Sequence, residues 1–324
     1  MTASFKKHES LFEGAMLTFD PPKKKHRQHH VWQYYLEPWT ANGKVFSLID
    51  GKPCRPNTKN VAVERHFYRL HRLTEADLKF IKLFIIDAGP AHAQRLHEEF
   101  LAALHAPRAF VEQNRHRLKN LEKIEELLET QEINVLEDYH ANIESSFATT
   151  LVAIRNGDIS FYEDQAECIM FARYMATQYM RTKAIKVRMI ETFQRNIGMD
   201  ISRIWDIASL MHGVNIGCSL FLGRKQQALV LVRNNTNVEF ITGDQPVINL
   251  HGGDRSKAPT QLCMYYPIGP SMALIWGDVN ERISYTSETL TTEQVADLNK
   301  KMMAASHSQV FARTETSLAR FAVA

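Results

Sequence analysis

Residues 227–250 read QALVLVRNNTNVEFITGDQPVINL, and residues 261–276 read QLCMYYPIGPSMALIW. In both stretches, runs of branched and aromatic residues alternate with Asn-Asn, Gly-Asp and Gly-Pro pairs. Such runs are typical of strands, and such pairs are typical of the turns that join antiparallel strands. The two stretches therefore predict an antiparallel sheet, followed by a capped helix over about 291–306 and a closing strand over 309–313.

The chain before this region has the character of helices. Residues 91–156 are almost free of Gly and Pro and carry apolar residues at spacings of three and four, which predicts several joined helices. Thr74, with Asp77 three residues later, predicts a capping box at the start of a buried helix. A further long helix is expected through residues 168–194, where a stripe of Met and aromatic residues indicates core packing rather than a cofactor site.

A short strand or hairpin arm is predicted at residues 44–50, KVFSLID, because glycine-containing segments flank it on both sides. Together these patterns indicate an α+β protein, in which a mainly helical body over about 74–222 meets an antiparallel sheet. We expect residues 223–324 and the N-terminal hairpin to build that sheet. We also expect a single domain over 26–324, preceded by a basic, flexible tail over 1–25.

Composition excludes several classes of protein. The 324 residues are 44% hydrophobic and 23% charged, which is typical of a globular protein, and the net charge of +3 is too small to indicate a nucleic-acid partner by itself. The four cysteines lie far apart, so neither a zinc site nor a disulfide framework is expected. No long apolar run and no signal peptide are found, and we therefore expect a cytoplasmic protein without a membrane partner.

A basic run, KKKHR, occupies residues 23–27 and precedes an aromatic segment. One interpretation is a solvated tail that leads into the first core element. Another is a phosphate-contacting patch in which Lys24, Lys25 and Arg27 guide a nucleic-acid backbone. A third is a nuclear-import signal. Well-known catalytic motifs give no further direction, because the chain has no P-loop, no GxGxxG before a helix for NAD, no GxSxG and no HExxH.

Five segments, taken in order, resemble the domain of unknown function 4238 family, which is found mostly in bacteria: HHVWQYYLEPWTANGKVF (29–46), NVAVERHFYRL (60–70), ATQYMRTKAIK (176–186), FITGDQPVINL (240–250) and YYPIGPSMALIWG (265–277). The resemblance spans nearly the whole chain. It implies a family without an assigned function, several members of which are found among bacterial defence or toxin-like genes.

The family's patterns place six polar residues at matching positions: His29, Gln33, Glu64, Gln178, Arg181 and Asp244. Two neighbours of the first pair depart from the pattern, since the family usually has an aromatic residue at His30 and a proline at Trp32. The usual Ser-Asp-Asn-Pro turn appears here as Gly-Asp-Gln-Pro at 243–246, which leaves a role for the side chains that flank the aspartate in doubt.

We interpret these six residues as one polar site anchored by apolar neighbours. The leading hypothesis is a hydrolase of nucleic-acid phosphodiester bonds, in which His29 donates a proton and Arg181 stabilises the charge on the phosphate. Glu64 and Asp244 would serve as base or would hold a Mg²⁺ or Mn²⁺ ion. The two amides, Gln33 and Gln178, would bind substrate.

Other interpretations remain open. Asp244 could bond nearby backbone in a turn, His29 could be a satisfied, partly buried histidine, and Arg181 could pair with Glu64 or another acid. The same residues could process a nucleotide or an ADP-ribosyl group. A non-enzymatic sensing module could use them as an ion-pair network at the junction of helices and sheet. A reactive site predicts an open pocket, whereas such a network predicts sealed and paired side chains.

Overall fold

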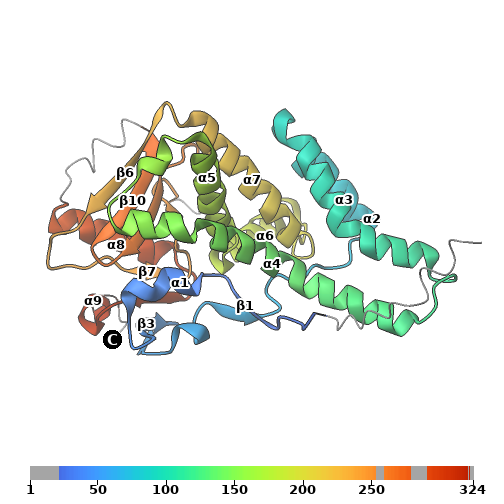
Figure 1. The fold of residues 1–324 in the computed structure, drawn as a ribbon, viewed down its shortest axis with the longest axis horizontal. Coiled ribbons are helices and arrows are strands. Elements are labelled where there is room, and N and C mark those ends of the chain that lie inside the picture. The colour runs from blue at the N-terminus through green and yellow to red at the C-terminus, as the bar shows by residue number, and fades with distance from the viewer. Residues whose placement is uncertain (1–21, 253–258, 279–289, 320, 322–324) are drawn as a thin grey trace, which may run out of the picture.

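The protein is described by a computed structural model over residues 22–252, 259–278, 290–319 and 321. The predicted N-terminal tail lies outside the described residues up to position 21. The predicted α+β class is confirmed: most helices form one side of the molecule, and the sheets form the other together with α1 (Gln33–Leu36), α8 (Thr292–Ala305) and α9 (Glu315–Ala319) (Figure 1). None of the described helices has the length and apolar character needed to cross a membrane.

The helical side follows the predicted order, except that one predicted helix is divided into two. Its helices are α2 (Glu75–Phe80), the π-helix η4 (Ile81–Ile86), α3 (Ala91–Asn114), α4 (Leu121–Arg155), α5 (Gln165–Met180), α6 (Lys183–Ile197) and α7 (Trp205–Gly223). The capping box of Thr74 and Asp77 is present. The predicted helix through 168–194 is interrupted, because Thr182 has an extended backbone and starts a new helix.

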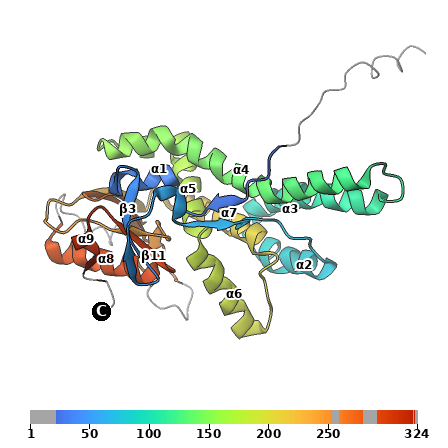
Figure 2. The same cartoon turned by 90° about the horizontal axis from the view of Figure 1, so that it is seen from below.

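Helix α4 is the longest element and connects the two sides of the molecule. Its C-terminal half lies beside α5 and the sheets, whereas its N-terminal half pairs with α3 in a hairpin that projects from the body (Figures 1 and 2). We call residues 91–132 of this hairpin the arm. Because α4 is one continuous helix, it links the arm rigidly to the core.

The strands form separate antiparallel sheets. One sheet has the order β6 (Gln227–Arg233), β10 (Met272–Asp278), β9 (Met264–Gly269) and β8 (Ile248–Asn249). The other has the order β2 (Thr40–Ala41), β3 (Lys44–Ile49), β11 (Gln309–Ala312) and β7 (Thr242–Gly243), with β4 (Lys52–Cys54) on β3. A small ribbon pairs β1 (Arg27–His29) with β5 (Val63–Arg65). The N-terminal hairpin thus joins the C-terminal strand β11, as the sequence predicted.

The segment VEFITGDQPVINL forms far less strand than its composition predicts. Only Thr242–Gly243 and Ile248–Asn249 pair as strands. The backbone before them is satisfied elsewhere, since the amide of Phe240 donates to the carbonyl of Pro270 and the amide of Ile241 donates to the side chain of Asn299. The latter belongs to helix α8 (Thr292–Ala305), whose predicted capping box is also present.

The burial of side chains on α5 supports the interpretation that its Met and aromatic stripe packs in the core. Phe171, Tyr174 and Met175 are fully buried against α4, β9 and β10, and only Met170 faces solvent. Tyr174 stacks on Phe147 of α4 with ring centroids 3.7 Å apart. Each such side chain contributes about 1.5–3 kcal/mol by leaving water, so this stripe anchors α5 and the residues at its end.

Candidate functional site

The side chain of Asp244 is buried, and its carboxylate binds the backbone of a turn. Its carboxylate accepts hydrogen bonds from the backbone amides of His307 (2.7 Å), Ser308 (2.9 Å) and Gln309 (3.0 Å). Burial raises the pKa of Asp244, and these three amide donors oppose the rise. Asp244 thus binds the backbone of a turn, as one interpretation expected. That turn is formed by residues 307–309, which are remote in sequence, and not by the neighbours of Asp244.

Gly243 explains how the turn can come so close. A Cβ atom at this position would lie 2.0 Å from Oγ of Ser306 and 2.9 Å from the carbonyl oxygen of Gln309. No side chain fits there without moving the turn. The glycine at position 243 is thus matched to the close approach of residues 306–309.

Arg181 is also sealed, and its partner is Glu144 of α4 rather than Glu64. The guanidinium lies 2.6 Å from the Glu144 carboxylate and donates to the carbonyl oxygens of His29 (3.2 Å) and His30 (3.4 Å). Despite burial, the neighbouring Glu144 carboxylate raises the pKa of Arg181. Residue 181 therefore ties α5, α4 and β1 together at the break between α5 and α6.

Several buried polar atoms around Arg181 have no hydrogen-bond partner among the described residues: Nδ1 of His30, Nδ1 of His140, Nε2 of Gln178 and Nη1 of Arg181 itself. Burial lowers the pKa of His30 to about 3 and that of His140 well below its ordinary value, so both rings are neutral at pH 7. Unpaired buried groups are costly, and water molecules commonly satisfy them. We call this cluster the Arg181 network.

Glu137 lies at the edge of the Arg181 network. Burial raises the pKa of Glu137 to about 7; the nearby Arg181 opposes this rise, and Glu144 adds to it. Between pH 4.5, its ordinary pKa, and about pH 7, the unfolded carboxyl is ionised while the folded one keeps its proton. Protonation of Glu137 in the folded protein therefore contributes its full stabilisation below pH 4.5. This stabilisation decreases as the pH rises and is lost above about pH 7.

Replacing Glu137 by glutamine is therefore expected to remove this loss. The free energy of unfolding is measured by urea denaturation at pH 5 to 8, and the difference between Glu137→Gln and the wild type should grow as the pH rises to about 7. The buried histidines, whose lowered pKa values act in the opposite direction, are common to both proteins. Glu122→Gln, an exposed carboxyl on the first turn of the same helix, is the control and should differ from the wild type by an amount that does not change with pH. Parallel curves for wild type and Glu137→Gln would contradict the assignment.

His29 and Glu64 lie on opposite faces of the β1–β5 ribbon. Gln28 is directly opposite Glu64, and His29 is opposite Val63, so adjacent positions alternate between faces. Glu64 forms an ion pair with Lys183 at 2.5 Å. The ring of His29 instead meets the carbonyl of Lys59 at 3.2 Å, and burial lowers its pKa. The structure does not bring these two side chains together with Asp244.

The remaining predicted residues are distributed over two places. Gln33 lies beside His29, with 3.4 Å between its Nε2 and the imidazole Nδ1. Gln178 lies beside Glu144, whose pKa is raised by burial while the guanidinium of Arg181 opposes the rise. The basic run is largely paired: Lys24 lies 2.7 Å from Glu129, Lys25 pairs with Asp138, and Arg27 donates to the carbonyl of Lys59.

An open groove lies on the other side of the Asp244 turn, between α6 and the end of α8. It has a volume of about 510 Å³, and its lining includes Arg188, Glu191, Arg195 and His307. An apolar well of about 130 Å³ adjoins it, since Arg188 and Ala305 line both. The basic groups, one carboxylate and one imidazole thus face the same open space.

The groove follows from local sequence in a simple way. Arg188, Glu191 and Arg195 are spaced by three and four on α6, so they share one helix face. His307 lies two residues after the end of α8, and the hydrogen bond from its amide to Asp244 fixes its backbone at the rim. The sequence analysis did not identify these residues. The helical spacing of the charged residues on α6 was a usable signal, but no sequence pattern indicated that residue 307 lies next to that helix.

Metal binding by Glu64 and Asp244 has little geometric support. Over the described part of the chain, no group of three or more His, Cys, Asp or Glu side chains is arranged to hold a metal ion. The Asp244 oxygens are already occupied by amide donors, and Glu64 is paired with Lys183.

Comparisons with known proteins agree with the sequence resemblance. The model of a family described as protein of unknown function (DUF4238) matches residues 27–316. No curated protein and no solved structure matches the chain.

Proposed function

Because the chain belongs to the DUF4238 family, whose description assigns no activity, we propose a function from the groove alone: cleavage of phosphodiester bonds in RNA. The observation that carries this proposal is the shared lining of one open groove by Arg188, Arg195, Glu191 and His307. Two guanidinium groups about two helical turns apart on one face of α6 suit an anionic phosphate backbone, since arginine binds phosphate oxygens in a bidentate manner.

The carboxylate and the imidazole provide an acid–base pair. Glu191 would accept the proton of a ribose 2′-hydroxyl, whose oxygen attacks phosphorus, and protonated His307 would give its proton to the departing 5′-oxygen. The O2′–P bond forms as the P–O5′ bond breaks, which leaves a cyclic phosphate and a free 5′-hydroxyl. Arg188 and Arg195 would stabilise the charge that develops on the phosphate oxygens. The 2′-hydroxyl is the nucleophile, and for this reason the proposal specifies RNA.

His307→Ala and Glu191→Gln are each expected to lower kcat/KM for RNA cleavage by about 10²–10⁴-fold. The substrate is a short RNA with a fluorophore and a quencher. It is assayed with and without a metal chelator, and the cleavage rate should be the same in both, because the proposed mechanism uses no metal ion. A matched oligonucleotide with 2′-O-methyl groups should resist cleavage.

Two exposed residues outside the groove give matched controls: His92→Ala on α3 and Glu167→Gln on α5 should keep full activity. Circular dichroism would show whether each variant is folded. Equal cleavage of the 2′-O-methyl substrate, or full activity of a folded His307→Ala protein, would refute the mechanism. Absence of RNA cleavage by pure wild-type protein would refute the proposed function.

A further inference from the structure

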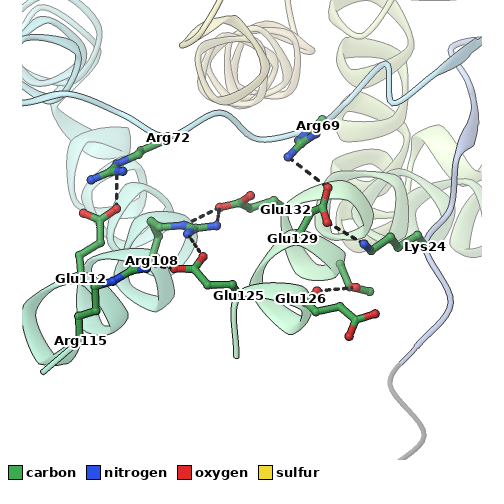
Figure 3. A network of polar contacts seen from close by, with 11 residues as sticks. Lys24, Arg69, Arg72, Arg108, Glu112, Arg115, Glu125, Glu126, Glu129 and Glu132 are labelled. Atoms are coloured by element: carbon green, nitrogen blue, oxygen red, sulfur yellow. Dashed lines mark hydrogen bonds and ion pairs between the residues drawn. The ribbon is translucent and has the colours of Figure 1, made fainter. Parts of the chain in front are cut away.

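The arm keeps most of its charges paired. Arg108 of α3 lies between two acids of α4, at 2.5 Å from Glu125 and 2.7 Å from Glu132. Arg115 reaches Glu125 at 3.0 Å, and Arg72 reaches Glu112 at 2.8 Å. Figure 3 shows these ion pairs as a network that joins α3, α4 and the segment before α2. The network holds the two helices of the arm in register.

The tip of the arm differs from the rest of it. Residues 114–123 read NRHRLKNLEK and carry Arg117, Lys119 and Lys123, all exposed. The side chains of these three residues make no ion pair with any residue that the structure describes. Asn120, with φ of 57°, takes the left-handed conformation that asparagine tolerates and turns the chain into α4. Figure 2 shows the turn between α3 and α4 at the far end of the projecting hairpin. The three cations lie in and next to this turn.

We propose that this tip is a second contact for single-stranded RNA, remote from the groove. Unpaired Lys and Arg side chains supply the sequence-independent attraction to a phosphate backbone. Phe110 lies one helical turn before the end of α3 and is 60% exposed, which offers a ring on which an unpaired base can stack. The inference rests on the proposed function, because it states how a long substrate is held while the groove acts on one phosphodiester.

The test separates long from short substrates. Binding of a 2′-O-methyl single strand of about 30 nucleotides is measured by fluorescence anisotropy over a range of salt concentrations. For the triple variant Arg117→Glu/Lys119→Glu/Lys123→Glu we expect at least about 10-fold weaker binding and a salt slope smaller by about 2, from roughly 0.7 per phosphate contact. Cleavage of a dinucleotide should be unchanged, since it reaches only the groove.

A matched triple variant, Lys44→Glu/Lys52→Glu/Lys225→Glu, changes the net charge equally at exposed positions elsewhere and should retain most of the binding. Phe110→Ala should weaken binding to the single strand more than to a duplex. Unchanged affinity and salt slope in the tip variant would overturn the proposal. So would loss of dinucleotide cleavage, or binding of the tip to anionic lipid vesicles but not to the oligonucleotide. If the wild type cleaves nothing but binding still depends on the tip, the proposed function fails, and the tip stands as a contact for single-stranded RNA without a role in cleavage.

Discussion

Asp244→Asn is expected to lower the free energy of unfolding by roughly 3 kcal/mol. The wild-type carboxylate accepts three backbone amides at 2.7–3.0 Å while buried. Asparagine offers only one acceptor oxygen, and its amide group would point donor protons at a backbone amide that also donates. At least one buried donor would lose its partner, and charge-assisted bonds of this kind are each worth about 1.5–3 kcal/mol.

Urea denaturation of wild type and Asp244→Asn at pH 7 measures this loss. Asp87→Asn is the control, because Asp87 is exposed and lies 3.6 Å from Lys82, a surface pair worth at most about 1 kcal/mol. If Asp244→Asn were as stable as the wild type yet inactive, the carboxylate would have a direct part in the chemistry, and its role in positioning His307 would be wrong.

Arg181→Met is expected to cost about 3–5 kcal/mol of stability, the range found when one partner of a buried ion pair is removed. The substitution leaves the Glu144 side chain, which is only 12% exposed, without the guanidinium that lies 2.6 Å away. The carbonyl oxygens of His29 and His30 also lose their donor.

The double variant Arg181→Met/Glu144→Gln completes a double-mutant cycle and should recover part of the loss, because no uncompensated charge remains. The exposed i,i+4 pair of Arg95 and Glu99, at 2.9 Å, provides a matched cycle with an expected coupling below about 0.5 kcal/mol. A loss below 1 kcal/mol for Arg181→Met would contradict the role of the Arg181 network as the tie between α4, α5 and β1.

Local signals predicted local features well. The capping boxes at Thr74 and Thr291 and the strand at 44–49 follow from residues within one helical turn or one strand. The interruption at Thr182 was missed, because the apolar periodicity continues across it while tertiary contacts are made at the break, among them the pair of Arg181 with Glu144 and the hydrogen bond of Thr182 to Gln245. Tertiary contacts thus overrode a continuous helical pattern.

The candidate site was harder to predict for the same reason. The sequence identified Asp244 and Arg181 as polar residues with buried neighbours, and both are buried. It did not identify their partners, which are 37 to 65 positions away: Glu144 for Arg181, and the amides of 307–309 for Asp244. The groove residue His307 depends on that second contact, so no short-range pattern could place it beside α6.

The pairing of β3 with β11 has a consequence for synthesis of the chain. Val310 of β11 is opposite Leu48 of β3, so a ribosome must make the whole stretch between these two positions before β3 receives this neighbour. Until then, one edge of the N-terminal hairpin has free amide and carbonyl groups, which in nascent chains invite pairing with other molecules. Premature termination before residue 309 should therefore yield a product that depends on chaperones and is prone to aggregate.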